Sequence, residues 1–217
     1  QMYGFLAYLD TNERAAFLSW DKVRSDSYVG NVMPYYNSGQ LSLLLELEKH
    51  QKIFLSAPTS FGKTSLLLEF IIQHHKSLAN VLIVPTNSLL EELYIKLIDN
   101  NRAFEMNYCI STQPYFRQGL RNFLIVTPER FLLLYEGCDL SSFDIIIMDE
   151  TYKIVDSKNE HISDFIEARS VRFRKVADMI GQTNNRLILL SPFTYELTDS
   201  MGRYLTRHGI KKIDRKI

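Results

Sequence analysis

The sequence has few of the residues that mark secreted, metal-dependent or membrane-embedded proteins. It contains two cysteines, Cys109 and Cys138, and neither these nor His74, His75 and His161 have the spacing of metal ligands. We therefore expect buried, reduced thiols and a cytoplasmic protein. No apolar run approaches the length of a transmembrane helix, and the N-terminus lacks a signal-peptide pattern, so we expect no membrane association.

The sequence also lacks a net charge, because its 25 Lys and Arg residues balance its 25 Asp and Glu residues. This balance excludes a global basic field, so any binding of nucleic acid must come from local loops and helix N-termini. There is no internal repeat, low-complexity tract or obvious linker between domains. With 217 residues, of which 46% are hydrophobic, one α/β domain with a sizeable core is expected. The chain opens on Gln1 rather than Met, and we expect that it was trimmed there.

The most informative stretch is KIFLSAPTSFGKTSLLLE, residues 52–69. Its first six residues predict a buried strand, and the residues from Gly62 onward predict a leucine-rich helix. The segment between has the pattern of a phosphate-binding loop, with Ala in place of the first Gly: Ala57-Pro58-Thr59-Ser60-Phe61-Gly62-Lys63-Thr64. In such a loop the backbone N–H groups and the helix dipole hold phosphate, Lys63 can reach the β- and γ-phosphates, and the Thr64 hydroxyl can ligate Mg²⁺. The alternative is a Gly-capped turn beside a surface lysine.

After this loop, short apolar segments alternate with amphipathic ones. We predict strands at 81–84, 106–110, 123–126, 145–149 and 187–190, and helices at 40–49, 88–100, 128–135, 164–180 and 195–207. The alternation indicates an α/β fold with a mostly parallel central sheet and helices on both faces. Ligands in such sheets bind at the carboxyl ends of the strands.

The second informative segment places two carboxylates after four apolar residues, at Asp149 and Glu150. In a phosphate-loop enzyme, the aspartate holds the Mg²⁺ shell and the glutamate orients or polarises the attacking water. The predicted catalytic residues are therefore Lys63, Asp149 and Glu150, with Thr64 and Asp149 as metal ligands. A strand that merely surfaces at an acidic turn is the alternative.

With these segments placed, the sequence resembles the first RecA-like domain of a superfamily 2 helicase, of the DEAD/DEAH-box or DExH kind, over residues 36–193. The resemblance implies a RecA-like P-loop NTPase domain at 36–217. Before it we expect a helical extension at 1–35, with a helix around residues 13–20. The resemblance also implies ATP and Mg²⁺ as cofactors, and a second RecA-like domain in the full-length protein that brings an arginine finger. The phosphate loop together with DETYK is also similar to helicases of prokaryotic anti-phage defence systems.

The motifs of that family occur in the expected order. Residues 57–64 look like motif I and 149–152 like motif II. Gln40 lies 17 positions before Ala57 (57 − 40), as suits the adenine-reading glutamine, and Tyr35 or Tyr36 could stack on the base. The nucleotide-binding residues implied are Gln40, Pro58, Thr59, Ser60, Phe61, Gly62, Lys63, Thr64 and Ser65. Nucleic-acid contacts are implied for motif Ia, Pro85, Thr86, Asn87 and Ser88, and for motif Ib, Thr127, Pro128, Glu129 and Arg130.

For the nucleic-acid residues a second interpretation stays open. Each group lies at a predicted helix N-terminus, where N–H groups and a hydroxyl can hold a phosphate. The same residues could simply cap the helix, with Asn87 or Ser88 as the cap and Glu91 or Glu92 following. The basic residues Arg169, Arg172, Arg174 and Lys175 indicate a solvated helix face or a contact with nucleic acid or a protein partner. We expect a solvated end for Arg203, Arg207, Lys211, Lys212, Arg215 and Lys216.

Three departures from the family pattern affect the prediction. Ser60 and Phe61 replace smaller residues in the loop, Tyr152 ends motif II, and Ser191-Pro192-Phe193 replaces the usual SAT of motif III. We assign Tyr152 and Ser191 to the coupling of hydrolysis with nucleic-acid movement. The predicted function is ATP hydrolysis that drives movement on, or unwinding of, DNA or RNA, with poor activity for this domain alone. A helicase-like scaffold and an unrelated P-loop kinase or switch ATPase are the alternatives.

Overall fold

A computed structural model describes residues 36, 38–58, 61–73, 79–137, 139–151, 164–192 and 199–214. The predicted extension at 1–35, loop residues Thr59 and Ser60, the coupling residue Tyr152 and Cys138 lie outside the described residues. Within them, strands and helices alternate along most of the chain.

Seven strands form one sheet in the order β3-β4-β2-β5-β6-β1-β7, and all neighbouring pairs are parallel. Burial is nearly continuous along the central strands because helices cover both faces of the sheet. The predicted fold class is therefore confirmed. The strands are β1 (Lys52–Ser56), β2 (Ala79–Ile83), β3 (Tyr108–Ser111), β4 (Arg121–Val126), β5 (Ile145–Met148), β6 (Arg186–Ser191) and β7 (Lys211–Asp214).

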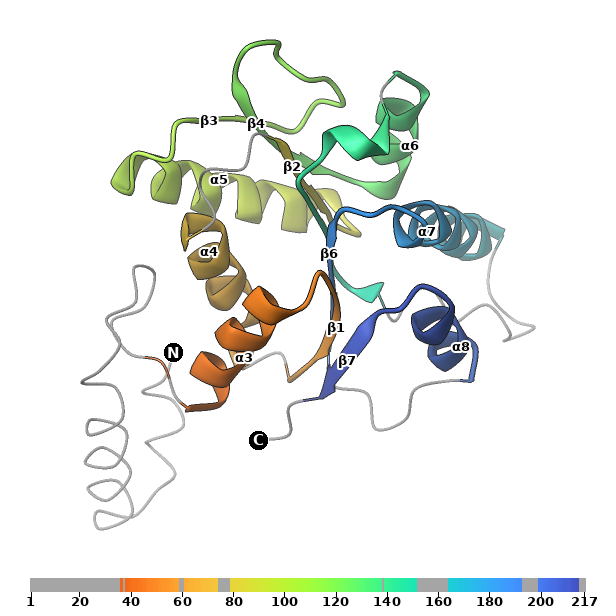
Figure 1. The fold of residues 1–217 in the computed structure, drawn as a ribbon. Coiled ribbons are helices and arrows are strands. Elements are labelled where there is room, and N and C mark those ends of the chain that lie inside the picture. Colours follow the sequence, from red (N-terminus) through yellow and green to blue (C-terminus); the bar gives the residue numbers. More distant parts are fainter. Residues whose placement is uncertain are drawn as a thin grey trace.

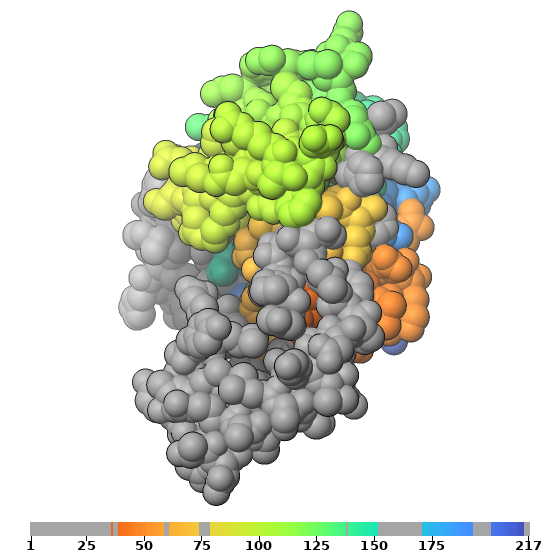
Figure 2. Space-filling model, turned by 90° about the vertical axis from the view of Figure 1, so that its left-hand side faces the viewer, coloured from red at the N-terminus to blue at the C-terminus, as the bar shows by residue number. Residues whose placement is uncertain are grey.

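Helices α3, α4 and α5 lie on one side of the sheet, and α6, α7 and α8 lie on the other (Figure 1). In the view turned by 90°, α5 spans the upper part of the first side (Figure 2). The helices are α3 (Ser38–Lys49), α4 (Lys63–Gln73), α5 (Asn87–Ala103), α6 (Pro128–Gly137), α7 (Asp164–Gly181) and α8 (Asp199–Arg207), with a short 3-10 helix, η2 (Leu140–Ser142).

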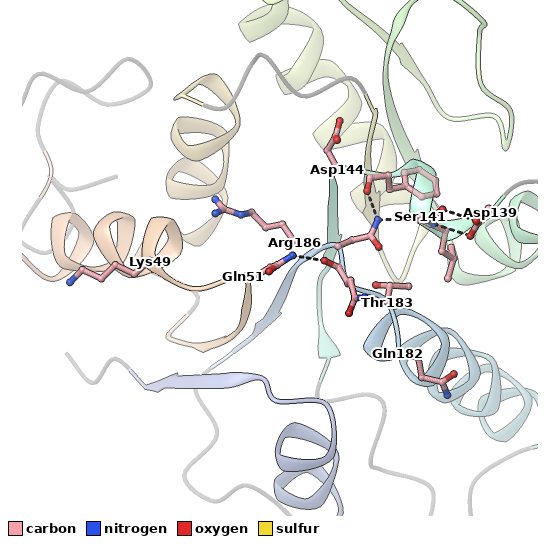
Figure 3. A pocket seen from close by; sticks show the side chains of 12 residues that line it. Lys49, Gln51, Asp139, Ser141, Asp144, Gln182, Thr183 and Arg186 are labelled. Atoms are coloured by element: carbon pink, nitrogen blue, oxygen red, sulfur yellow. Dashed lines mark hydrogen bonds between the residues drawn. The ribbon is translucent and has the colours of Figure 1, made fainter.

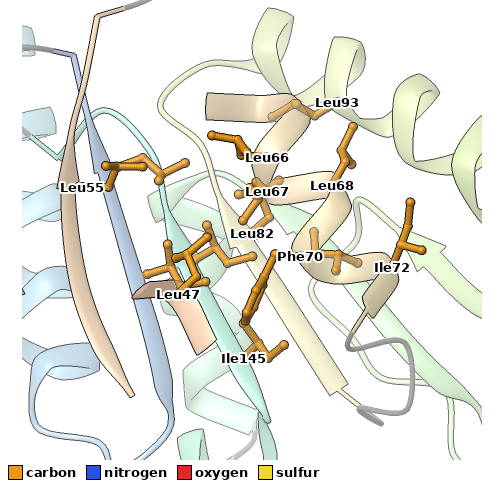
Figure 4. Packing of buried hydrophobic residues seen from close by; sticks show 14 of the residues in the cluster. Leu47, Leu55, Leu66, Leu67, Leu68, Phe70, Ile72, Leu82, Leu93 and Ile145 are labelled. Carbon is orange, nitrogen blue, oxygen red and sulfur yellow. The ribbon is translucent and has the colours of Figure 1, made fainter. Parts of the chain in front are cut away.

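Two apolar cores follow from the alternation of side chains along each strand. In β1, Ile53 and Leu55 join the core under α3, α4 and α5, whereas Phe54 joins the core under α6, α7 and α8. The first core includes the leucines of α4 and Phe70, which pack against Leu47 of α3 and Leu82 of β2 (Figure 4). This packing fixes the helix that follows the phosphate loop against the sheet.

The sequence did not predict strand β7. Its residues pair with β1 in parallel, Ile53 with Lys211 and Leu55 with Ile213, and only Ile213 is buried. One apolar residue among four gives no strand signal, because an edge strand needs few buried side chains. A second difference concerns Cys109, which is half-buried on edge strand β3 rather than fully buried.

Candidate nucleotide and nucleic-acid site

The predicted motifs lie together at one edge of the sheet because every described strand is parallel. Ser56 of β1 pairs with Ser191 of β6, and Ile83 of β2 pairs with both Met148 of β5 and Val126 of β4. Motifs I, Ia, Ib and II begin one or two residues beyond these strand ends, and motif III begins at Ser191, the last residue of β6. The structure thereby brings the phosphate loop, the acidic pair and the motif III serine to one place.

The phosphate loop is held by backbone and side-chain hydrogen bonds. Phe61 N–H donates to the Pro58 carbonyl over 3.1 Å, and Leu66 N–H donates to the Gly62 carbonyl over 3.0 Å, which begins α4. Gly62 has φ +81°, a conformation that glycine adopts without strain. The loop thus ends in a turn that directs the amino end of α4 toward the motif edge.

The Lys63 ammonium lies back against its own loop. It donates to the carbonyl oxygens of Ala57 at 2.6 Å and Pro58 at 3.0 Å. Burial lowers the pKa of Lys63, whereas the negative charges of Asp149 and Glu150 act to raise it. The acidic pair therefore lies close enough to stabilise a charged lysine, and the two carbonyls take the place that phosphate oxygens would occupy around the ammonium.

Gln40 contacts the same loop from α3. Its side-chain amide donates to the Phe61 carbonyl over 2.8 Å and is 8% exposed. A Cβ added at Gly62 would come within 3.2 Å of that amide nitrogen, so the Gln40 side chain lies directly over the turn. The structure thus places the predicted adenine-reading residue against the phosphate loop.

Tyr36 does not have the position of a base-stacking residue. Its side chain is completely buried, and its hydroxyl donates to Glu69 of α4 over 2.8 Å. The stacking interpretation of Tyr36 is therefore wrong for this structure, and Tyr35 lies outside the described residues. The contact between Tyr36 and Glu69 has no local sequence signal, because 33 residues separate the two.

Glu150 is one of three described non-glycine residues with a positive φ, at +55°. Its backbone N–H donates to the Asp149 carboxylate over 2.7 Å. A left-handed backbone costs a residue with a Cβ roughly 1–2 kcal/mol. Backbone strain of this kind is found at active sites, where the surrounding structure holds a side chain in a required direction.

Thr151 is a site residue that the sequence analysis missed. Its side chain is completely buried, and its hydroxyl donates to the Leu190 carbonyl over 2.8 Å. Strand β6 extends beyond the end of β5, and the next carbonyl, that of Ser191, accepts from Ala57 N–H on the β1 side. The Leu190 carbonyl points away from β1, toward the side of β6 on which β5 lies. The Thr151 hydroxyl there takes the place of a backbone N–H of β5, and this hydrogen bond connects motif II to the strand that ends in motif III.

The predicted metal ligands fit magnesium in kind. Thr64 and Asp149 offer a hydroxyl and a carboxylate, both hard oxygen donors, and both are half-buried at the motif edge. No group of three His, Cys, Asp or Glu residues that could hold a metal occurs among the described residues. A Mg²⁺ ion that keeps several waters and binds substrate phosphates needs only one or two protein ligands. Thr64 and Asp149 are therefore enough for such an ion without a larger cluster of ligands.

Comparison with known proteins identifies the family of this chain. The family of DEAD/DEAH box helicases matches residues 37–193, which is more than half of the chain. The chain belongs to the DEAD/DEAH box helicase family. No helix in the described part of the chain is long and apolar enough to cross a membrane.

Individual relatives are distant. Reverse gyrase 2 from Sulfolobus acidocaldarius is 25% identical over 149 residues, which are 64% of this chain and 13% of that protein. A hypothetical ATP-dependent RNA helicase from Sulfolobus tokodaii has a similar fold, with a TM-score of 0.56 and 18% identity over 87% of this chain and 53% of its own. The DEAD-box helicase Mss116, bound to single-stranded RNA and UDP-BeF, also has a similar fold, with a TM-score of 0.55. It is 15% identical over 86% of this chain and 38% of its own. This chain thus spans about half or less of each of these proteins.

The residues in the positions of motifs Ia and Ib lie at helix N-termini and cap them, as one of the two interpretations predicted. The capping residue of α5, however, is neither Asn87 nor Ser88. Thr86 caps α5, its hydroxyl accepting from Leu89 N–H over 3.3 Å, and leaves Asn87 and Ser88 exposed. Pro85, Thr127 and Pro128 are buried. Arg130 donates to the Thr112 carbonyl over 3.0 Å, and Glu129 lies 3.5 Å from Arg172 of α7.

The structure contains a hollow at the opposite edge of the sheet, with a volume of about 750 Å³ (Figure 3). Its described lining comes from the amino ends of β1, β5 and β6 and includes none of the helicase motif residues. The Asn185 amide donates to the Leu140 carbonyl over 2.8 Å and to the Phe143 carbonyl, and Gln51 donates to the Asn184 carbonyl. These amides join loops to one another, so the polar groups here support the fold.

Proposed function

We propose that this chain is the ATP-binding first motor domain of a superfamily 2 helicase or translocase. The observation that carries the proposal is the convergence of Lys63, Asp149 and Glu150 beyond the carboxyl ends of β1 and β5, the two strands that flank β6, with both carboxylates acting on the charge of the lysine. A lysine, a Mg²⁺-binding aspartate and a water-orienting glutamate are the groups that phosphoryl transfer to water needs.

Binding of ATP would begin with an exchange of partners at Lys63. The ammonium gives up the carbonyls of Ala57 and Pro58 and takes phosphate oxygens in their place. Backbone N–H groups of residues 61–65, at the amino end of α4, hold the remaining phosphate charge. Gln40 reads the base from its position over Gly62.

Hydrolysis would use the acidic pair. Thr64 and Asp149 hold Mg²⁺, which neutralises charge on the phosphates when it is bound. Glu150 orients the attacking water from its strained backbone position. A second RecA-like domain contributes the arginine that stabilises the transition state, so this domain alone turns over slowly.

Contact with nucleic acid would form along the same edge of the sheet. Asn87 and Ser88 are exposed at the amino end of α5, where N–H groups can hold a phosphate of the backbone. The structural relative Mss116 was solved with single-stranded RNA. Recognition through phosphates is independent of sequence, as a motor that moves along a strand requires.

The test is ATP hydrolysis by a chain that includes the second RecA-like domain, measured alone and with single-stranded DNA or RNA. Lys63→Ala and Glu150→Gln serve as inactive controls. We expect stimulation by one polymer that both substitutions abolish, and the stimulating polymer identifies the track. Hydrolysis that ignores both polymers would point to a kinase or switch ATPase, and nucleotide binding without hydrolysis would point to a scaffold.

A further inference from the structure

A completely buried carboxylate lies in the helix that carries the phosphate loop lysine. Glu69 is on α4, its side chain has 0% exposure, and neither phosphate nor Mg²⁺ binding as proposed above uses it. A buried carboxylate needs strong partners, because desolvation disfavours its charge. Here the partners include the Tyr36 hydroxyl at 2.8 Å and the Gln73 amide at 3.4 Å.

The Tyr36 contact fixes the position where α3 begins. Tyr36 lies two residues before α3, and its ring belongs to the core between α3, α4 and the sheet. Four residues later, Gln40 contacts the phosphate loop at Phe61. The amino end of α3 is therefore attached at two points to one continuous segment, the loop and α4 at residues 61–69.

The second attachment is made by the base-reading side chain itself, and the first lies four residues before it. The Tyr36–Glu69 bond and apolar packing both hold the first turn of α3 in its position relative to Gly62. Apolar packing has little directional preference, whereas a hydrogen bond to a charged group fixes a distance and an angle. A small displacement of α3 would move the Gln40 amide away from the base edge.

We propose that Glu69 is a positioning residue for nucleobase selection: through Tyr36 it holds α3 so that Gln40 meets the adenine edge beside the phosphate loop. The inference rests on the proposed ATP-binding function and deepens it. Glu69 acts through Tyr36 and Gln40 and touches no nucleotide. It therefore affects the choice of base, while the attraction of the loop for the triphosphate stays unchanged.

The experiment compares the dissociation constants of ATP and UTP, which carry the same ribose and triphosphate, by calorimetric titration of the protein with Mg²⁺. Tyr36→Phe removes the hydroxyl and keeps the ring. Because a buried hydrogen bond contributes about a factor of ten, we expect the preference for ATP over UTP to fall about fivefold to tenfold, with UTP affinity unchanged. Glu69→Gln keeps an acceptor for the tyrosine and should retain most of the preference, whereas Glu69→Leu should lose it.

Tyr108→Phe is the matched control. Tyr108 is also a buried tyrosine, its hydroxyl accepts from Asn80 over 3.1 Å, and it lies on edge strand β3, far along the sheet from β1. We expect a similar loss of thermal stability and no change in base preference. If Tyr36→Phe resembles Tyr108→Phe in both respects, Glu69 is only structural and the inference is wrong.

The wild-type titration separates the inference from the function on which it rests. Failure to bind either nucleotide would overturn the proposed function. Equal affinity for ATP and UTP would overturn the inference and leave phosphate binding by the loop intact.

Discussion

The two ends of the same sheet use polar residues in opposite ways. At the carboxyl end, Lys63 is partly buried with a lowered pKa, and Glu150 has a left-handed backbone. At the amino end, the Asn185 amide joins two carbonyls, and Asp139 caps η2 by accepting from Ser141 N–H over 3.0 Å. Polar groups thus stabilise the fold at the amino end and destabilise it at the carboxyl end. This is the pattern expected where a binding site holds a lysine away from water and a backbone in an unfavourable conformation.

The largest expected effect is a loss of ATP hydrolysis, with little change in stability, on substitution of a residue at the carboxyl end of the sheet. Lys63→Ala should lower ATP hydrolysis by at least about 100-fold, as losing one preorganised charged donor does. The free energy of unfolding should change by less than about 1 kcal/mol, because the lost hydrogen bonds are offset by relief of lysine desolvation. Steady-state hydrolysis and urea unfolding measure the two. Lys49→Ala, at the amino-end hollow, is the control and should change neither.

The converse is expected at the amino end. Asn185→Ala should lower the free energy of unfolding by about 2 kcal/mol, because buried carbonyls of Leu140 and Phe143 lose a donor. Hydrolysis per folded molecule should stay unchanged. Asn184→Ala is the control, since its side chain is exposed. Loss of activity without loss of stability would contradict the contrast between the two ends.

A smaller effect tests the strain at Glu150. Glu150→Gly should raise the free energy of unfolding by about 0.5–1 kcal/mol, because relief of the positive φ exceeds the entropic cost of glycine. Hydrolysis should be lost at the same time. Glu150→Gln keeps a Cβ and should lose hydrolysis with no gain in stability. Equal unfolding curves for the two variants would show that the backbone stores no strain there.

The smallest effect is a pH dependence near the amino end. Burial lowers the pKa of His208, helped by the charges of Lys52 and Arg207 and opposed by Asp178 and by a hydrogen bond with the Gly181 backbone. The unfolded state then binds the proton first, so stability should fall as pH drops from 6.5 toward the folded pKa and should be constant above 6.5. His208→Gln should remove that part of the slope. Urea unfolding between pH 8 and pH 5 measures it, and identical slopes would contradict it.

Much of the fold could be predicted because buried parallel strands are continuous apolar runs. The strand ends predicted from sequence differ from the observed ends by two residues or fewer, as for β2, which begins at Ala79 instead of residue 81. Strand β7 could not be predicted, because Ile213 is its only buried residue. Its pairing depends on the free edge of β1, which is a property of the whole sheet.

The candidate site could be predicted in part. Local patterns indicated the loop and the acidic pair, since each is a short segment after an apolar run. The contacts of Tyr36 with Glu69 and of Thr151 with Leu190 join residues 33 and 39 positions apart. Such pairs depend on how helices and strands pack, and no spacing rule along the chain indicates them.

The place of β1 in the sheet sets an order for folding. Both of its neighbours, β6 and β7, come from residues 186–214, more than 130 positions after β1. During synthesis β1 therefore has no partner strand until the ribosome has passed Ser191, although β2 can pair with β4 and β5 before then. Such distant pairing is slow because a long loop must close first. The strand that leads into the phosphate loop is thus among the last to join the sheet, and a nascent chain acquires the proposed nucleotide site only after most of the domain has folded.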